Sequence, residues 1–123
     1  MTYKSDVGWL AEDVAANYLE GKGYKILDRN YWKPWGEIDI IAEKESVVIF
    51  CEVKANAHPG SNFDPSLRAD YEKLNKVIRS ARIYLSNKKY GDDQPWQVDL
   101  VTVVFDKASE KAKITHFKNI TEL

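Results

Sequence analysis

The chain has 123 residues, 44% of them apolar, and its 18 basic and 19 acidic residues give a formal net charge of -1. This length is enough for one continuous hydrophobic core and too short for two ordinary domains, so we expect a single domain over residues 1–123. The balanced charge excludes a globally basic surface, so a nucleic-acid partner would have to be held by a local basic patch.

The first predicted element is an amphipathic helix over residues 5–22. Its apolar residues recur at the i, i+3, i+4, i+7 spacing of one helix face: Val7, Leu10, Ala11, Val14, Ala15 and Tyr18. Gly23 follows as a helix stop. Three short runs rich in Ile, Val and Phe come next, at residues 24–29, 36–43 and 46–55. They predict three strands, arranged as a meander.

A second, longer helix is predicted after these strands. Asp64 offers an N-cap with Pro65 at the first helical position, and apolar residues then keep helical spacing: Leu67, Tyr71, Leu74, Ile78, Ala81 and Leu85. After a loop rich in Gly, Asp and Pro, residues 96–105 and 113–117 predict two further strands. The predicted order is therefore α-β-β-β-α-β-β, which is an α/β fold.

Acidic residues occupy positions in two of these strands where a core strand normally carries Val or Ile. Burying a carboxylate is expensive unless a cation or hydrogen-bond donors compensate. The period of two puts Glu37, Asp39 and Ile41 on one face of the second strand and Ile38, Ile40 and Ala42 on the other, and it groups Val48, Phe50, Glu52 and Lys54 on the third. If residues 43–46 form a hairpin turn, Asp39 can lie across from Glu52 at roughly 5 Å, within range of one shared ion.

Two carboxylates so placed favour a hard divalent cation. Oxygen ligands suit Mg²⁺ or Mn²⁺ better than zinc, so Asp39 and Glu52 are candidate metal ligands. Lys54 projects to the same face as Glu52, where its ammonium could orient an attacking water or offset charge on a scissile phosphate. An alternative interpretation is that these charged residues line the solvated face of an antiparallel sheet as ordinary surface pairs.

Short motifs in a fixed order extend along the chain. They are Gly8-Trp9-Leu10-Ala11-Glu12, Tyr18-Leu19, Gly23-Tyr24, Ile26-Leu27, Asn30, Gly36-Glu37-Ile38-Asp39-Ile40-Ile41 and Phe50-Cys51-Glu52-Val53-Lys54, with weaker continuations at Lys73, Ala81, Tyr84-Leu85 and Val98-Asp99-Leu100-Val101. In this order and spacing they resemble the bacterial YraN-type endonuclease-like family, which is related to archaeal Holliday junction resolvases within the PD-(D/E)XK nuclease superfamily. The resemblance covers almost the whole chain.

The resemblance implies a restriction-endonuclease-like core, a mixed central sheet flanked by helices. It places Asp39 and the Glu52-Val53-Lys54 triplet at the superfamily's metal and catalytic positions. It also places Glu12 at an additional acidic position on the first helix, where such a residue completes the metal shell or orients a ligand. On pattern alone, Glu12 could equally be an ordinary exposed helix residue. One departure is Ala55-Asn56, where family members often carry a basic residue.

Basic residues on the second predicted helix form a candidate nucleic-acid-binding face. Lys76, Arg79 and Arg82 recur every third residue, away from the apolar stripe, with Arg68 on a similar side. Lys73 lies beside the stripe, so it could face the cleft and contact a phosphate. A solubilising face, with Lys73 extended over the core, is the alternative.

An aromatic and basic loop is predicted at residues 31–35, between the first two strands. It adds Trp32 and Lys33 as candidate contacts, because exposed aromatic side chains can stack on unpaired bases. Packing against a neighbouring surface or a second subunit would explain this loop equally. Residues 58–63 suggest a flexible lid, while Cys51 and His116 are interpreted as structural.

Location and membrane association are predicted from what the sequence lacks. The single Cys51 cannot form an intrachain disulfide, and the chain start has no basic, apolar signal pattern, so we expect a cytoplasmic protein. The longest apolar stretch, residues 47–53, is interrupted by Glu52 and is far below the roughly 20 residues of a membrane-spanning helix. We therefore expect no membrane association.

Three functional hypotheses follow. The first is an Mg²⁺-dependent or Mn²⁺-dependent endodeoxyribonuclease that cuts branched or structured DNA, for which a homodimer would suit symmetric cutting. The second is a non-catalytic nucleic-acid-binding or assembly module that keeps the nuclease fold, which the near-neutral charge and Ala55-Asn56 favour. The third, an acid/base enzyme using Glu37 and Asp39, is weaker because these residues are only two apart and no base-orienting partner is evident.

Overall fold

The structure is a computed structural model of the chain, and it describes residues 4–56 and 71–121. Its elements are α1 (Asp6–Gly21), β1 (Lys25–Lys33), β2 (Gly36–Lys44), β3 (Val47–Asn56), α2 (Tyr71–Asn87), β4 (Trp96–Asp106) and β5 (Lys111–Phe117). The predicted order α-β-β-β-α-β-β is confirmed. The predicted helix start at Asp64-Pro65, the Leu67 and Arg68 positions, and the lid at residues 58–63 lie outside the described residues.

Helix α1 begins at a side-chain cap and ends at a glycine. The hydroxyl of Ser5 accepts a hydrogen bond from the Gly8 N–H at 3.1 Å, and Gly23 adopts a φ of +93° just beyond the helix. The buried stripe consists of small residues, Leu19 and one acid: Ala11, Glu12, Ala15, Ala16 and Leu19. The predicted stripe was wrong at its start, because Val7 and Leu10 are exposed.

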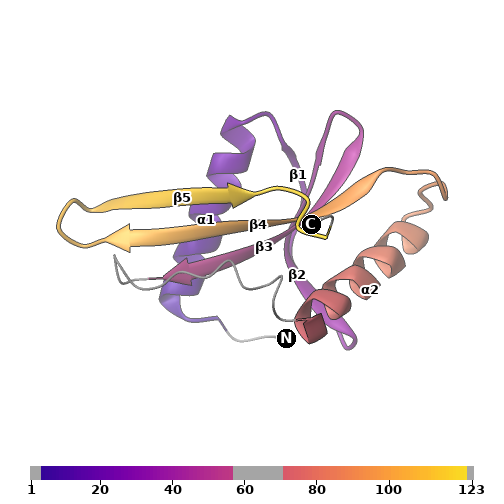
Figure 1. The fold of residues 1–123 in the computed structure, drawn as a ribbon, viewed down its shortest axis with the longest axis horizontal. Coiled ribbons are helices and arrows are strands. Elements are labelled where there is room, and N and C mark those ends of the chain that lie inside the picture. Colours follow the sequence, from indigo (N-terminus) through magenta and orange to yellow (C-terminus); the bar gives the residue numbers. More distant parts are fainter. Residues whose placement is uncertain (1–3, 57–70, 122–123) are drawn as a thin grey trace.

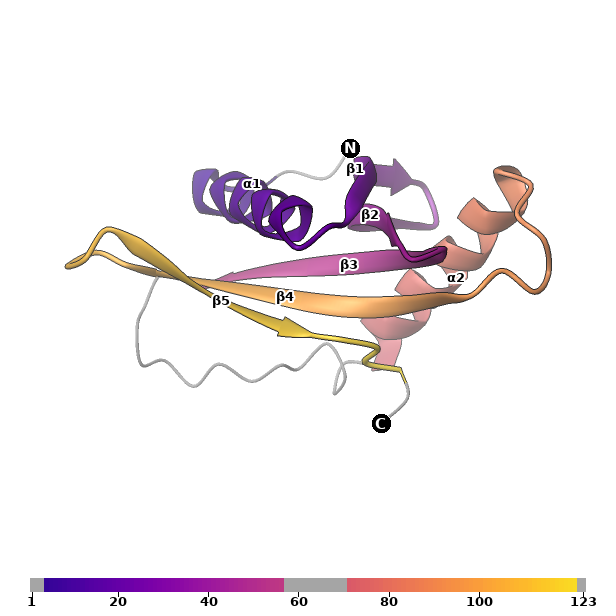
Figure 2. The same ribbon diagram turned by 90° about the horizontal axis from the view of Figure 1, so that it is seen from above.

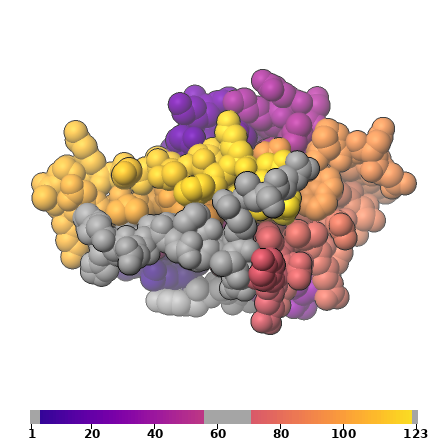
Figure 3. Space-filling model, in the orientation of Figure 1, coloured from indigo at the N-terminus to yellow at the C-terminus, as the bar shows by residue number. Residues whose placement is uncertain are grey.

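The five strands form one mixed sheet in the order β1-β2-β3-β4-β5. Only β3 and β4 are parallel; the other neighbours are antiparallel. Because parallel strands need a crossover, α2 lies in the segment that joins β3 to β4 (Figure 1). Figure 3 shows the β4–β5 turn at one end of the molecule and the segment joining α2 to β4 at the other. The expected mixed sheet with flanking helices is confirmed.

The two helices cover opposite faces of the sheet. On β3, Val48 and Phe50 belong to the cluster around α2, whereas Ile49 and Cys51 belong to the cluster around α1. Successive strand residues point to opposite faces, so β3 is buried on both sides. In the view of Figure 2, α1 lies above the sheet, over β3 and β4. Any polar side chain on β3 is therefore surrounded by protein unless the packing opens.

The β1–β2 hairpin is kinked where Asn30 stands opposite Asp39. Asn30 has a φ of +51°, and the register of Arg29 with Ile40 and of Tyr31 with Ile38 skips this pair. The kink changes which face the following residues occupy. The prediction that Ile38 shares a face with Ile40 was therefore wrong, because Ile38 packs toward α2 and Ile40 toward α1.

Strand β1 is longer than predicted. It continues to Lys33, so Trp32 and Lys33 lie at a strand end and only Pro34 and Trp35 form the turn to β2. The predicted loop over residues 31–35 was wrong in extent. Its physical reason is packing, since the ring of Tyr31 meets that of Tyr84 on α2 edge to face at 5.4 Å.

Neither α1 nor the described part of α2 combines the length and the apolar character that a membrane-crossing helix requires.

Candidate active site

Strands β2 and β3 separate at the predicted acidic pair. Their register runs from Lys44 opposite Val47 to Ile40 opposite Cys51, and one further step would bring Asp39 opposite Glu52. The ladder stops there, and Asp39 Oδ2 instead accepts a hydrogen bond from the Val53 N–H at 2.8 Å. The carboxylate of Asp39 thus replaces a backbone carbonyl as the acceptor for the Val53 N–H, and β2 and β3 separate at this point.

This opening is lined by residues from both helices and from two strands. Its volume is about 260 Å³, and it is lined by Lys4, Ser5, Gly8, Ala11, Glu12, Glu37, Asp39, Glu52, Val53, Ala55 and Lys73. We call it the acidic cavity. The four carboxylates come from positions 12, 37, 39 and 52, far apart in the chain, and the kink at Asn30 and the end of the β2–β3 ladder bring them together. Such a concentration of acid in a largely buried site needs compensating cations.

Glu52 is the acid that the central strand contributes to the cavity. Its side chain lies on the central strand β3 with 5% exposure, and its Oε1 atom has no hydrogen-bond partner among the described residues. Burial raises the pKa of Glu52 well above its ordinary value of 4.5, and the charges of Asp39 and Glu37 raise it further, while the ammonium of Lys73 opposes them. The neutral form of this carboxyl is therefore favoured up to a higher pH than in an exposed glutamate.

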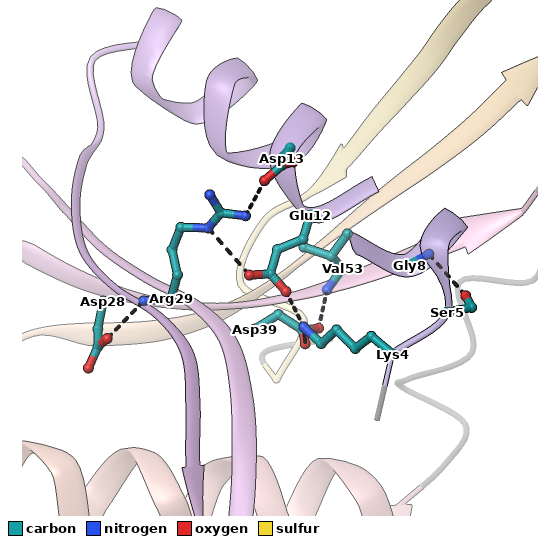
Figure 4. A network of polar contacts seen from close by, with 9 residues as sticks. All are labelled: Lys4, Ser5, Gly8, Glu12, Asp13, Asp28, Arg29, Asp39 and Val53. Atoms are coloured by element: carbon teal, nitrogen blue, oxygen red, sulfur yellow. Dashed lines mark hydrogen bonds and ion pairs between the residues drawn. The ribbon is translucent and has the colours of Figure 1, made fainter. Parts of the chain in front are cut away.

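Glu12 and Asp39 share one ammonium group. Lys4 Nζ donates to Glu12 Oε2 and to Asp39 Oδ1, the second at 2.9 Å. Burial acts to lower the pKa of Lys4, but the hydrogen bonds to Glu12 and Asp39 outweigh it, so the pKa is raised. Figure 4 shows Lys4 reaching from the segment before α1 to place its ammonium between the two carboxylates.

Arg29 on β1 holds the other side of Glu12. Its Nε atom donates to Glu12 Oε1 at 3.3 Å, and its terminal nitrogen donates to Asp13 Oδ1 at 2.6 Å (Figure 4). Glu12 is 1% exposed yet bonded to two cations, so it is not an ordinary exposed helix residue. This arrangement fixes the carboxylate of Glu12 at the cavity wall.

The donor set of the acidic cavity fits a hard divalent cation in part. Asp39 and Glu52 present carboxylate oxygens, and the orphaned Oε1 of Glu52 is the kind of buried acceptor that a cation satisfies. Over residues 4–56 and 71–121, however, no three Asp, Glu, His or Cys side chains form a ready metal-binding group. Mg²⁺ typically takes only one or two protein carboxylates, with water and phosphate completing its shell, so Asp39 and Glu52 are the residues that would hold it.

A second opening adjoins the acidic cavity. It lies between the tip of the β1–β2 hairpin and α2, has a volume of about 480 Å³, and is lined by Trp32, Lys33, Pro34, Trp35, Gly36, Glu37, Glu72, Lys73, Lys76 and Val77. We call it the hairpin pocket. Glu37 and Lys73 line both openings, so the two share a wall. In Figure 1 the hairpin tip lies beside the first turns of α2.

The sequence is similar to proteins of several organisms. Residues 11–103 match the model of a family described as Uncharacterised protein family UPF0102. The chain belongs to this family. A UPF0102 protein of Fervidobacterium nodosum is 39% identical over 115 residues, covering 90% of this chain and 78% of that protein. A UPF0102 protein of Alkaliphilus oremlandii is 35% identical over 113 residues, covering 92% and 95%, and one of Wolinella succinogenes is 48% identical over 82 residues, covering 67% and 72%.

The UPF0102 fold brings some of the sequence-predicted site residues together and leaves others apart. Glu12, Asp39, Glu52 and Lys73 all line the acidic cavity. Lys54 does not line it; its side chain is exposed on β3, two residues beyond Glu52. Of the proposed nucleic-acid contacts, Trp32, Lys33 and Lys76 line the hairpin pocket together with Lys73, whereas Arg79 and Arg82 are exposed on α2 and line neither opening.

Three features of the UPF0102 site were missed from the sequence. Lys4 precedes the first helix and carries no periodic signal, and nothing in the sequence joins it to Asp39, 35 residues later. Glu37 was placed on the same strand face as Asp39, but it was not predicted to line both openings. Trp35 was placed in a loop, although its position in a two-residue turn is signalled by Pro34 and Gly36 on either side.

The two residues interpreted as structural have buried, defined roles. Cys51 is fully buried, and burial raises the pKa of its thiol well above the ordinary range, so it is inert packing. His116 Nε2 lies 2.7 Å from Asp99 Oδ2, and its Nδ1 lies 3.1 Å from the Tyr18 hydroxyl. These contacts join β5, β4 and α1 on the side of the sheet away from the hairpin pocket.

Proposed function

We propose that this UPF0102 protein is an endonuclease of the PD-(D/E)XK type that uses Mg²⁺ or Mn²⁺ to hydrolyse phosphodiesters of structured or branched DNA in the cytoplasm. The observation that carries the proposal is the opening of the sheet at Asp39 and Glu52, where a buried Glu52 oxygen has no partner among the described residues. Buried polar atoms are normally hydrogen-bonded, so a carboxylate oxygen without a partner in a cavity supports the proposal of a binding site.

The residues divide into holding and positioning roles. Asp39 and Glu52 would hold the cation, and Val53 fixes the Asp39 carboxylate through its N–H. When bound, Mg²⁺ would supply Lewis acidity toward the phosphoryl oxygen and lower the pKa of its water. Lys73 would face the charge of the phosphate from α2, since it lines the cavity and already acts on Glu52. Glu12, held by Lys4 and Arg29, would orient a ligand of the cation.

Of the proposed catalytic residues, Lys54 is the one that does not line the acidic cavity. Its role is proposed from the Glu52-Val53-Lys54 triplet, in which the ammonium offsets charge that develops on the phosphate. Because Lys54 is exposed on β3, its ammonium is accessible to a strand of nucleic acid at the protein surface. Substitution of Lys54 is therefore the sharpest separate test of catalysis, because it removes no member of the acidic cavity.

The test is cleavage of labelled single-stranded, duplex, flap and four-way-junction DNA with Mg²⁺, Mn²⁺ or EDTA. We expect metal-dependent cutting by the wild type, and a loss of about 100-fold or more in both Asp39→Asn and Lys54→Ala. Lys113→Ala, on the exposed surface of β5, is the matched control and should cut like the wild type. A wild type that binds these DNAs but cuts none with either metal would overturn the catalytic proposal.

The second candidate function is a nucleic-acid-binding or assembly module without catalysis. A specific observation favours it: the Lys4 ammonium already compensates Glu12 and Asp39, as a structural ion pair would. Isothermal titration with Mn²⁺ separates the two candidates, because a pure binding module has no need of a cation at Asp39. Binding that Asp39→Asn abolishes supports the nuclease; equal weak binding by both proteins supports the module.

A further inference from the structure

The hairpin pocket has the size and chemistry of a small-molecule site rather than of a gap between elements. Its volume of about 480 Å³ falls within the range of about 300–1,000 Å³ typical of ligand pockets. Its position is fixed by close packing, since a Cβ atom on Gly36 would lie 2.4 Å from Ser80 Oγ on α2. The turn that carries Trp35 is therefore seated directly on the helix that carries Lys73 and Lys76.

The pocket wall offers flat aromatic surfaces. Trp32 is 42% exposed at the end of β1, and Trp35 follows in the turn, with Pro34 between them in the lining. Trp32 and Trp35 line the same pocket, and ligand pockets are lined predominantly by hydrophobic and aromatic side chains. Aromatic side chains of this kind bind nucleobases by stacking, which tolerates any base because every base has a π face.

Two polar atoms of the same wall lack partners. The indole Nε1 of Trp35 is a donor and Glu37 Oε2 is an acceptor, and both are buried with no hydrogen-bond partner among the described residues. Buried polar groups are normally satisfied, so an orphaned donor and an orphaned acceptor in one pocket indicate a ligand that carries both. The edge of a nucleobase carries donors and acceptors side by side.

The charges around the pocket favour a phosphate-bearing ligand. Lys33, Lys73 and Lys76 line it, against the acids Glu37 and Glu72. Lys76 lies 3.8 Å from Glu72 in an exposed pair of little energetic value, so it can turn to a phosphate at small cost. Because Glu37 and Lys73 also line the acidic cavity, a base in the hairpin pocket places its neighbouring phosphate toward Asp39 and Glu52.

We propose that the hairpin pocket binds one unpaired nucleobase of a nucleic-acid strand, stacked on the indoles of Trp32 and Trp35 and read at its edge by Trp35 Nε1 and Glu37. A base in a duplex is stacked on both faces and paired along one edge, so it does not enter such a pocket. The site therefore selects strands with unpaired nucleotides next to the phosphate that is cut. The identity of that phosphate rests on the proposed function; the recognition of the base does not.

The acceptor at Glu37 also predicts which bases are preferred. A carboxylate accepts hydrogen bonds and donates none, so it favours the exocyclic amino groups of cytosine, adenine or guanine over the carbonyl groups of thymine. Glu37→Gln replaces one acceptor by a donor at almost unchanged shape. This substitution should shift the preference toward thymine rather than weaken all bases equally.

The test measures binding in EDTA by fluorescence anisotropy. One probe is a short labelled DNA backbone that is abasic throughout, and the other carries a single cytosine at its centre. We expect the wild type to bind the cytosine probe about 10-fold more tightly, the size of one base–aromatic contact. Trp32→Ala, which removes a stacking ring, should lose most of this difference, and Trp35→Phe, which keeps a ring and removes the N–H, should lose part of it. Trp9→Phe, on exposed α1 surface, is the matched control and should keep it.

Each outcome is decisive for the pocket. Equal binding of the two probes, or no binding of either, overturns the proposal. It is also overturned if Trp32→Ala and Trp35→Phe both keep the full difference in affinity between the probes. Saturable binding of free cytidine monophosphate at the same affinity as the cytosine probe would mean that the ligand is a nucleotide and not a strand. Ribose versions of both probes show whether the strand is DNA or RNA. Because no metal is present, failure here leaves metal-dependent cleavage to be judged by its own assay.

Discussion

The ammonium of Lys4 lies where it would compete with a divalent cation for carboxylate oxygens. It is bonded to Glu12 and Asp39, is only 13% exposed in its side chain, and carries one charge where Mg²⁺ would carry two. Opposite charges at this distance and burial interact more strongly than they would in water. Metal binding at Asp39 must therefore displace or share this contact.

Removing that competitor should strengthen metal binding. In Lys4→Met, which keeps an apolar stem of similar length, we expect Mn²⁺ to bind about 5-fold more tightly, the effect of roughly 1 kcal/mol. Isothermal titration calorimetry measures the change. Lys22→Met, just beyond the end of α1, is the matched control and should bind like the wild type. Weaker Mn²⁺ binding in Lys4→Met would show that Lys4 organises the site instead of competing for it.

Glu52 should make stability depend on pH. Its folded pKa is raised above the ordinary value of 4.5, so between these two values the folded protein holds a proton that the unfolded chain has lost. The free energy of unfolding therefore falls as pH rises above 4.5, by at most about 1.4 kcal/mol for each pH unit, and levels off above the folded pKa. Below pH 4.5 both states are protonated and the group has no effect.

Glu52→Gln removes this dependence. We expect it to unfold at higher urea concentration than the wild type at pH 7, with the difference shrinking as pH falls toward 4.5. Urea titrations at a series of pH values without metal measure it, and Glu20→Gln on exposed α1 surface is the control. A difference that stays constant with pH would mean that Glu52 is ionised in the folded protein, against the direction given by its burial.

The residues of the acidic cavity differ in how far the sequence could predict them. Asp39 and Glu52 follow from a short hairpin, because the two-residue turn at Glu45 and Ser46 fixes the register. Lys4 could not be predicted, because its contacts depend on where an extended segment meets the sheet. The sharing of a wall by two openings also depends on tertiary packing, which no local pattern encodes.

At the scale of elements, the packing of Gly36 against α2 holds the hairpin pocket in place. A Cβ at this position meets Ser80 Oγ at 2.4 Å, and Ser80 is itself fully buried with a hydroxyl that lacks a partner among the described residues. Gly36→Ala should therefore lower the free energy of unfolding by about 1–3 kcal/mol through overpacking.

A second substitution tests this cause. Ser80→Ala removes the clashing oxygen and an unsatisfied polar group, so alone it should be nearly neutral. Combined with Gly36→Ala it should restore the part of the stability that the clash costs, while the strain of a side chain at the φ of +159° remains. Urea unfolding of the two single variants and the double variant gives the coupling energy. Additive effects would place the strain of Gly36→Ala elsewhere, for example at the Lys76 carbonyl, 3.4 Å from the added atom.

Element order was easier to predict than element faces. The runs of apolar residues gave seven elements in the correct order, because helix and strand periods differ clearly over these lengths. Faces failed where the backbone departs from regularity. The face of β2 changes between Ile38 and Ile40, beside the positive φ of Asn30, so Ile38 faces α2. Val7 and Leu10 are exposed because they lie outside the buried face of α1.

At the scale of the whole molecule, hydrogen bonds hold one part of the sheet together, while the sheet opens at Asp39 and Glu52. The carboxylate of Asp99 on β4 is fully buried and accepts hydrogen bonds from Gln97 Nε2 at 2.8 Å and the Asn119 N–H at 2.9 Å, besides its contact with His116. Every oxygen of that acid is satisfied. Glu52, buried on the neighbouring strand, differs in that its Oε1 has no hydrogen-bond partner among the described residues, and the proposed cation would satisfy this oxygen.

Metal should therefore stabilise the whole fold and not only the cavity. A ligand that binds the folded state alone raises the free energy of unfolding by about 2.7 kcal/mol at 100 times its Kd. We expect the Tm of the wild type to rise with added Mg²⁺ or Mn²⁺ and to return when EDTA is added, whereas Asp39→Asn should show no rise. Asp93→Asn, on the exposed segment before β4, controls for nonspecific ionic effects and should respond like the wild type. An equal rise in Asp39→Asn would show that the stabilising cation does not bind through the carboxylate that Val53 holds at the opening of the sheet.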